Sequence, residues 1–472
     1  MAELVAYGAY VPYWRLERAA IAAVLGTGAT KGSRSVSSFD EDSTSMAVEA
    51  SRVAVAAAPA SWHPSAMILS TTSPAYQDKT NATAIHAALR LPQSVAAYDF
   101  VGAVRSGTGA LRFAQASATP SLVVLSDVRT GLAGGADEAS NGDAAVAFAF
   151  GEGPGLVEAL GAGSSTEEFL ERWRTPGAPS SGVWEERFGE IAYLPLAQAA
   201  AVDALKSAGI DIGEVDHLVV AGLHARAVRS LIGSLGVSSS AISDDLTGTV
   251  GNTAIAHAGL LLADVLDRAE PGQTILVVQL ADGADAVVLR TTDALSAYRE
   301  RRVTTVAEQI TAGRSGLPYA KFLRWRGSLQ FEPPRRPDPD SPAAPPSLRN
   351  EAWKFGFTAS QCEACGTRHL PPARVCHHCH AVDQMSEVCL ANVTGTIRTY
   401  TVDHLAFSLS PPVVTAVVDF DGGGRINAEM ADVDPTEVQI GQRVRMTFRR
   451  LYTAPSGVHD YFWKAKLTRT ED

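Results

Sequence analysis

The chain has 472 residues, of which 46% are hydrophobic and 19% charged, and these values exclude a mostly disordered chain. A net charge of −11 disfavours a general nucleic-acid-binding or membrane-surface protein. No apolar run reaches the roughly 18 residues of a membrane span, and the first residues lack the pattern of a signal peptide. At roughly 150 residues per domain we expect about three domain-sized units, in a cytoplasmic protein without nucleic-acid or membrane partners.

Residues 1–295 predict an α/β architecture. Short apolar runs predict buried strands at Leu4–Tyr7, Ala66–Ser70, Leu122–Leu125, Ala144–Phe150, His217–Ala221 and Thr274–Gln279. Apolar residues at i, i+3, i+4 and i+7 predict helices at Ser43–Ala57, Asn81–Leu89, Gly107–Ala116, Leu194–Ala208, Ala225–Leu235 and Ala256–Asp267. The same order of strands and helices occurs twice, near 1–160 and near 190–295, which suggests an internal duplication with little residue identity.

A proline-rich stretch separates this region from the rest of the chain. Residues 331–349 carry proline at a density that should exclude helix and central strand and form a semi-rigid spacer. Beyond it, short strands with turn signals are predicted at Val393–Val402, Val413–Phe420, Arg425–Met430, Arg443–Leu451 and Tyr461–Leu467. Five strands in about 80 residues favour a small barrel of the OB type.

The cysteines gather in one short segment. All five lie at or after Cys362, so the first 361 residues contain no thiol that could act as a nucleophile. Cys362, Cys365, Cys376 and Cys379 form two CxxC pairs that can present four thiolates tetrahedrally to Zn²⁺. Because four protein ligands leave no open position, we expect one structural zinc per chain. In a cytoplasmic chain a metal outranks two disulfides; the alternatives are iron or a site that has lost its metal.

Two other features of the second region have more than one interpretation. Any of the histidines among the cysteines could replace a thiolate, but the complete cysteine set favours solvated side chains; these are His369, His377, His378 and His380. A zinc ribbon with an OB barrel also suggests nucleic-acid binding. Residues 391–472 hold nine Lys and Arg against ten Asp and Glu, whereas a single-strand groove needs a clear positive excess, so that interpretation is disfavoured.

Polar motifs in the first region are weak signals when each is taken alone. The turn that begins at Arg105 (RSGTGA) follows the strand-like Ala96–Val101 and opens a helix, so its backbone N–H groups could face an anion, or it could be an ordinary tight turn. Asn252 could cap the helix after it, and His257 could be a core histidine. His224 follows a predicted strand, where chemistry is common, but one histidine alone decides nothing.

Read together, these segments resemble the thiolase superfamily, in the branch of hydroxymethylglutaryl-CoA synthase and ketoacyl synthase III. The likeness is carried, in the family's order and spacing, by YGAYVPYWRL, Phe39–Ser51, Arg105–Ala114, Asn141–Phe150, Val250–Asp267 and Phe322–Gly327. From about Trp353 the chain resembles the DUF35 family, a rubredoxin-like zinc ribbon followed by an acyl-CoA-associated OB fold, through TGTIRTYTV, VVDFDGG and IGQRVRMTFRRL.

The resemblance implies a duplicated, layered α/β/α/β/α fold followed by a zinc ribbon and a barrel. The expected domains are a thiolase-like first half at 1–170, a second half at 171–330, the linker at 331–349, the ribbon at 350–384 and the OB fold at 385–472. It also implies a homodimer through the thiolase-like domain and a CoA thioester as substrate.

The sequence departs from the family at the residues that do its chemistry. Family members carry a nucleophilic cysteine one residue before the position of Arg105, where this chain has Val104. The family's general-acid glutamate aligns with Thr72, and its histidine aligns with Ala221, three residues before His224. The asparagine position is kept as Asn252.

Valine cannot form an acyl thioester, so a covalent condensation through cysteine is excluded. We therefore expect aldol or retro-aldol chemistry on a 3-hydroxyacyl-CoA, in which an oxyanion hole holds a thioester enolate. The alternatives are an acyltransferase of the synthase type with a non-cysteine mechanism, and a non-catalytic subunit that binds acyl-CoA as a scaffold.

The predicted catalytic residues are His224 or His257 as the base, since a neutral imidazole titrates near working pH, and Asn252, which would orient or polarise the thioester oxygen. The predicted substrate-binding residues are Thr72, Val104, Arg105 and Gly107.

Overall fold

The computed structural model describes residues 2–28, 31–332 and 340–468. The chain forms two compact units: the first comprises Met1–Ser37, Asp42–Thr83 and Gln93–Phe322, and the second comprises Ser38–Glu41, Ala84–Pro92 and Leu323–Asp472. A search of the described helices finds none with the length and apolar content that a membrane crossing requires.

Thirteen strands are described up to residue 322. They are β1 (Glu3–Tyr10), β2 (Trp14–Glu17), β3 (Ser33–Val36), β4 (Ala66–Thr71), β5 (Ala96–Val101), β6 (Ser121–Asp127), β7 (Ala144–Gly151), β8 (Val157–Ser165), β9 (Arg172–Trp173), β10 (Gly182–Val183), β11 (His217–Gly222), β12 (Thr274–Leu280) and β13 (Ala284–Thr291). The helices are α1 (Arg18–Leu25), α2 (Ser43–Ala57), α3 (Ala82–Ala88), α4 (Arg105–Ala116), α5 (Ala136–Ser140), α6 (Glu186–Ala208), α7 (Ala225–Leu235), α8 (His257–Arg268), α9 (Ala294–Arg301), α10 (Val306–Thr311) and α11 (Tyr319–Trp325), and a 3₁₀ turn, η3 (Ala254–Ala256), precedes α8.

Two mixed sheets form the centre of the first unit. The first has the order β1-β7-β6-β4-β5, and the second has the order β11-β12-β13-β8. In each sheet a parallel pair (β4 with β6, β11 with β12) is followed by two antiparallel partners (β7 and β1, β13 and β8). This shared order is the internal duplication that the sequence suggested.

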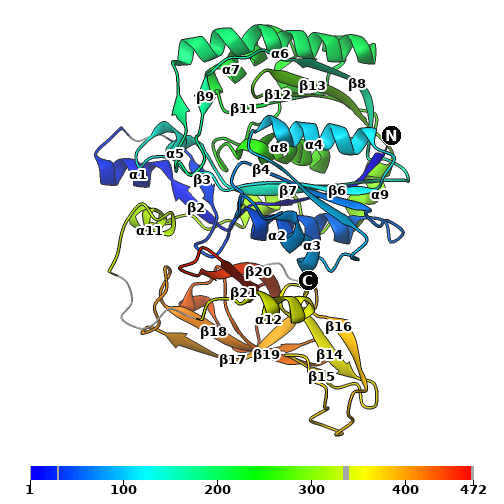
Figure 1. Cartoon of the computed structure of the whole chain (residues 1–472). Helices are drawn as coiled ribbons and strands as arrows, with labels where there is room; N and C mark the ends of the chain where they lie inside the picture. Colours follow the sequence, from blue (N-terminus) through cyan, green and yellow to red (C-terminus); the bar gives the residue numbers. More distant parts are fainter. Residues whose placement is uncertain (1, 29–30, 333–339, 469–472) are drawn as a thin grey trace. The chain divides into compact units, whose positions relative to one another are not determined.

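Helices cover both faces of both sheets (Figure 1). Helix α2 packs on β1, β6 and β7, whereas α6 packs on β8, β12 and β13 and contacts α7. Helices α4 and α8 contact strands of both sheets and lie between them. The unit is therefore a stack of five layers, α/β/α/β/α, and the predicted fold class is confirmed. The predicted boundary at residue 170 stays a prediction, and β8 of the second sheet lies before it.

Glycines let the outer helices approach the sheets closely. A Cβ on Gly8 of β1 would lie 2.4 Å from the backbone nitrogen of Ala54 in α2. A Cβ on Gly163 of β8 would lie 2.1 Å from the carbonyl oxygen of Ala200 in α6. The two halves thus use the same device, a glycine on the first strand against an alanine-rich helix.

The predicted strands and helices of residues 1–295 are confirmed, several within one or two residues at each end. Helix α6 is longer than predicted, because it begins at Glu186 and continues through Pro195. Proline removes the hydrogen bond to the carbonyl four residues earlier. That carbonyl belongs to Ile191, which lies on the exposed face of α6, where water can replace the lost donor.

The second unit contains a three-stranded sheet and a five-stranded barrel. Its elements are α12 (Ala344–Arg349), α13 (Glu351–Lys354), β14 (Thr358–Cys362), β15 (Arg368–His369), β16 (Met385–Cys389), β17 (Gly395–Asp403), β18 (Val413–Phe420), β19 (Arg425–Glu429), β20 (Arg443–Thr453) and β21 (His459–Leu467). The barrel sheet has the order β19-β18-β17-β20-β21, and a bridge between Met430 and Ala465 closes it. The predicted OB-type barrel is confirmed.

Aromatic rings and a buried ion cluster fill the second unit. Phe357, Phe448 and Trp463 are buried and in mutual ring contact. Beside them Asp432 accepts hydrogen bonds from Arg449 at 2.6 Å and from Lys466 at 2.8 Å. Burial alone would raise the pKa of Asp432, but the two cations outweigh burial and hold that pKa far below its ordinary range. The cluster keeps these charges paired inside the unit.

The expectation that residues 331–349 exclude helix is wrong for the end of this stretch. Residues 344–349 form α12, with Pro345 and Pro346 in its first turn. Proline is tolerated there because the first backbone N–H groups of a helix have no acceptor within the helix. Residues 333–339 of the predicted linker lie outside the described residues.

The close packing of β8 on α6 gives a stability prediction. Gly163→Ala should lower the free energy of unfolding by about 1–3 kcal/mol, because its Cβ meets backbone rather than a movable side chain. Chemical denaturation measures this, with Gly213→Ala as the control, since a Cβ there meets nothing within 4 Å. Equal midpoints for the two variants would show that the approach is not tight.

The edge of the first sheet favours the predicted homodimer. Strand β5 is an edge strand, and Tyr98 and Val101 on it are 54% and 43% exposed, with Phe113 of α4 65% exposed nearby in ring contact with Phe100. We expect sedimentation at micromolar concentration to give twice the chain mass of 49.6 kDa. Tyr98→Glu should shift the mass toward that of the single chain, and a wild type that sediments as a monomer would refute the prediction.

Candidate functional site

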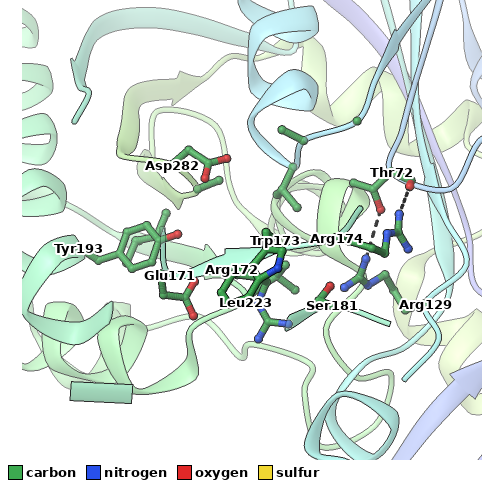
Figure 2. A pocket seen from close by; sticks show the side chains of 15 residues that line it. Thr72, Arg129, Glu171, Arg172, Trp173, Arg174, Ser181, Tyr193, Leu223 and Asp282 are labelled. Carbon is green, nitrogen blue, oxygen red and sulfur yellow. Dashed lines mark hydrogen bonds between the residues drawn. The ribbon is translucent and has the colours of Figure 1, made fainter. Parts of the chain in front are cut away.

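A cavity of about 220 Å³ lies in the first unit where the two halves meet. It is lined by Thr72, Gly102, Ala103, Val104, Arg129, Glu171, Arg172, Trp173, Arg174, Ser181, Tyr193, Leu223, Leu280, Ala281 and Asp282 (Figure 2). Several of these residues directly follow the parallel strands β4, β6, β11 and β12. The cavity thus lies at the carboxyl ends of parallel strands, which is where ligands bind in α/β sheets.

The size of the cavity limits what can occupy it. An apolar cavity of roughly 150 Å³ holds benzene, so 220 Å³ holds an acyl group of several carbon atoms. A complete CoA molecule is much larger than this space. Only the reacting end of a thioester would therefore fit inside.

Two of the predicted substrate-binding residues, Thr72 and Val104, line the cavity. Val104 is the residue just before α4, a helix of twelve residues. The amino end of a helix carries partial positive charge, so this position favours an oxygen that gains negative charge. The valine side chain itself offers neither a nucleophile nor a proton.

Thr72 is held in place by a buried aspartate. Asp127, at the end of β6 and fully buried, accepts hydrogen bonds from the Thr72 N–H at 2.7 Å and from the Thr72 hydroxyl at 3.0 Å. It also accepts from the hydroxyls of Thr71 and Ser73 and from the backbone N–H of Ile255 in η3. One carboxylate therefore ties a loop of the first half to the start of α8 in the second half.

Three arginines lie on one side of the cavity (Figure 2). Arg129 donates to the Thr72 hydroxyl at 3.2 Å, and Arg174 donates to the Thr72 carbonyl. Arg172 pairs with Asp137 at 2.7 Å. Burial lowers the pKa of Arg129, while Asp127 and Asp137 oppose that effect. The Nε atoms of Arg129 and Arg172 are buried without a hydrogen-bond partner among the described residues, so this wall can donate further to a bound ligand.

A carboxylate and a phenol lie on another side of the cavity. Glu171 is 3% exposed, and burial is the main cause that raises the pKa of its carboxyl. Tyr193 of α6 is buried, and burial raises the pKa of its hydroxyl above its ordinary range. The adjacent Asp282 lies in the exposed β12–β13 turn.

The two predicted histidines are not among the residues that line the cavity. His224 caps α7: its Nδ1 accepts from the Ala227 N–H at 3.0 Å, and its Nε2 lies 3.0 Å from the Glu186 carbonyl oxygen. His257 is buried at the start of α8, and burial lowers its pKa to about 4. His224 packs beside Glu171, because a Cβ on Gly189 would touch both side chains.

The other predicted site residues link elements around the cavity. The Asn252 side chain donates to the Gly222 carbonyl at 2.8 Å and accepts from the Ala254 N–H at 2.9 Å. Arg105 pairs with Asp285 at 2.8 Å and donates to the Asp282 carbonyl. Gly107 gives α4 room beside η3, since a Cβ there would lie 2.8 Å from Ile255. The assigned catalytic and binding roles of these residues remain predictions.

Sequence reasoning missed most of the polar residues of the cavity: Asp127, Arg129, Glu171, Arg172, Arg174, Tyr193 and Asp282. Asp127 had a usable signal, because it is a lone carboxylate at the end of an apolar strand. Glu171 had none, since it lies in an irregular segment between β8 and β9 with other charged residues on both sides.

The four predicted zinc ligands come together in the second unit. Their sulfur atoms all lie within 4.8 Å of one another, and the Cys362–Cys379 and Cys365–Cys376 pairs are 3.5 and 3.6 Å apart. Four sulfurs at about 2.3 Å from a tetrahedral zinc would lie about 3.8 Å apart, whereas a disulfide needs about 2.05 Å. The donor set fits a structural zinc with no open position.

The histidines of this segment do not join the cluster. His369 is buried, in contrast to the predicted solvated side chain, and its Nδ1 lies 2.8 Å from Nδ1 of His377. His378 and His380 are exposed, as predicted. The complete cysteine set is therefore the candidate metal site.

Comparisons with known proteins separate the two regions of the chain. The chain is 30% identical over 349 residues to hydroxymethylglutaryl-CoA synthase of Methanopyrus kandleri, an alignment that covers 70% of this chain and 98% of the synthase. It is 31% identical over 352 residues to the synthase of Archaeoglobus fulgidus, with 70% and 100% covered. Residues 356–383 match the model of the ChsH2 rubredoxin-like zinc ribbon domain, and residues 387–449 match that of the ChsH2 C-terminal OB-fold domain.

Solved structures support the same fold for the first region. MvaS in complex with 3-hydroxy-3-methylglutaryl coenzyme A matches with a TM-score of 0.59 and 18% identity, covering 72% of this chain and 94% of MvaS. β-Ketoacyl-[acyl carrier protein] synthase III of Thermus thermophilus matches with a TM-score of 0.54 and 20% identity, covering 62% and 99%.

The sulfur cluster predicts one zinc per chain. Cys365→Ser should lose the metal and unfold the ribbon, because in such small modules metal binding supplies most of the folding energy. Metal analysis after purification without chelators measures the zinc content. Cys389→Ser is the matched control, since Cys389 is the one cysteine outside the cluster. A metal-free wild type, or equal loss in both variants, would contradict the assignment.

Proposed function

The chain belongs to the hydroxymethylglutaryl-CoA synthase family over the 70% of its length that aligns with those two synthases, and on that premise we propose that it makes or breaks a carbon–carbon bond in an acyl-CoA without a cysteine nucleophile. The favoured reaction is retro-aldol cleavage of a 3-hydroxyacyl-CoA, or its reverse. One observation carries the proposal: Val104, at the family's nucleophile position, lines a cavity that still has room for an acyl group.

The proposed reaction needs no covalent intermediate. A base takes the proton from the 3-hydroxyl group, the C2–C3 bond breaks, and a carbonyl forms at C3. The electron pair of the broken bond passes to the thioester, which becomes an enolate until C2 takes up a proton. The protein must therefore stabilise negative charge on the thioester oxygen and supply one group that exchanges a proton.

Groups for the first task surround the cavity. The amino end of α4 begins beside Val104, and the arginine wall contains buried nitrogens without partners. Asn252 has one side-chain N–H engaged with Gly222, which leaves its second N–H for the thioester oxygen if the predicted role holds. Fixed donors of this kind are worth more in a water-poor cavity than in solution.

Two alternatives use the same cavity. The similarity to synthases favours acyl transfer by a direct, non-cysteine mechanism. The replacement of the family's glutamate and histidine positions by Thr72 and Ala221 favours a subunit that binds acyl-CoA as a scaffold and does no chemistry. In each case the CoA thioester is the ligand, and the dimer and the structural zinc support the assembly.

A panel of 3-hydroxyacyl-CoA thioesters tests the proposal. We expect a shorter acyl-CoA and an aldehyde or ketone in equal amounts. Alkylation of exposed thiols should leave the rate unchanged while the zinc stays bound, because the first 361 residues contain no cysteine. Acyl-transfer products would favour the second hypothesis, and tight CoA binding without turnover of any thioester would favour the third.

A further inference from the structure

Glu171 is unusual among the acidic residues of the first unit. It is 3% exposed, yet its Oε1 is buried without a hydrogen-bond partner among the described residues. Buried polar atoms are nearly always paired, and the exceptions concentrate at functional sites. The side chain also lines the cavity (Figure 2).

The backbone holds this carboxylate in place. The Glu171 carbonyl accepts a hydrogen bond from the Trp184 N–H at 2.7 Å, which ties it to the β9–β10 hairpin. On its other side, α6 presents Gly189, where a Cβ would lie 2.7 Å from the Glu171 Cγ. The position is thus rigid and has no spare room, as a group that must meet a substrate requires.

The surrounding charges leave the carboxyl poised for proton exchange. Burial is the largest cause that raises its pKa; Arg172 and His224 lower the pKa, and Asp282 and Asp137 raise it. Tyr193 lines the same side of the cavity. The balance favours burial, so the pKa lies above the ordinary glutamate value and nearer to working pH, where a general base is most effective.

The other candidates for the base are less suited. Asp127 uses its two oxygens on five hydrogen bonds, and Asp282 is exposed. Both ring nitrogens of His224 have protein partners. His257, with a pKa of about 4, is a weak proton acceptor at neutral pH.

We infer that Glu171 is the general base of the cavity, an inference that rests on the proposed function. The Glu171 carboxylate takes the 3-hydroxyl proton as the C2–C3 bond breaks and the carbonyl forms. The resulting carboxylic acid then returns this proton to C2 of the thioester enolate. The products are a shorter acyl-CoA and a carbonyl compound, and Glu171 ends as it began, so no oxidant, reductant or co-reactant is needed.

Glu171→Gln tests this role with almost no change in shape. It should slow cleavage of a 3-hydroxyacyl-CoA by about 10²–10⁴-fold while the dissociation constant for that thioester stays within a few-fold. Glu171→Asp should retain more activity than Glu171→Gln, because it keeps the carboxyl. Glu167→Gln is the matched control, since Glu167 is exposed and does not line the cavity.

The pH dependence gives a second measurement. Wild-type cleavage should fall as pH decreases through the raised pKa of Glu171, since only the carboxylate accepts the proton, and Glu171→Gln should lack this limb. A carboxyl with a raised folded-state pKa destabilises the fold above that pKa. Glu171→Gln should therefore melt above wild type at pH 8, and the difference should close as pH falls to about 4.

The outcomes separate the inference from the proposed function. Slow cleavage, retained binding and higher melting of Glu171→Gln support both. If wild type cleaves the thioester and Glu171→Gln cleaves it within threefold of that rate with the same pH limb, Glu171 is not the base, although the function stands. If wild type cleaves none of the thioesters, the proposed function fails and the inference fails with it.

Discussion

The buried carboxylate of Asp127 is the contact on which the cavity depends. It has no exposed surface, yet five donors from three segments converge on its two oxygens. A buried carboxylate would be costly without such partners. Because the donors come from the loop after β4 and from η3, satisfying this one charge fixes the two halves of the first unit against each other. The cavity opens beside that junction, lined by Thr72 from the same loop.

The cavity walls contrast with this satisfied centre. Glu171, Arg129 and Arg172 each keep a buried polar atom without a partner among the described residues. Such atoms weaken the free protein and are compensated only when a ligand supplies the missing hydrogen bonds. The structure therefore stores its unsatisfied polarity where an acyl thioester would bind. Stability and function compete at these three side chains, whereas at Asp127 they agree.

Local patterns in the sequence were sufficient to predict the framework. Helices α2 and α7 have their predicted bounds, and the two CxxC pairs converge because a short ribbon brings them together. Strand β8 was missed because the glycines that α6 requires interrupt its apolar run. The cavity was predicted only in part: Thr72 and Val104 were found through the family's spacing, but the arginines and Glu171 come from irregular segments. Their convergence is decided by tertiary packing, which has no short-range signal.

The account makes the thioester enolate, and not an acyl-enzyme, the central species of the reaction. Deuterium exchange at C2 of acetyl-CoA, followed by mass spectrometry in D₂O, measures enolate formation without requiring the identity of the carbonyl partner. We expect the wild-type chain to catalyse exchange at a rate that alkylation of exposed thiols leaves unchanged, since no cysteine precedes Cys362. No exchange above the uncatalysed rate, with acetyl-CoA shown to be bound, would contradict the account.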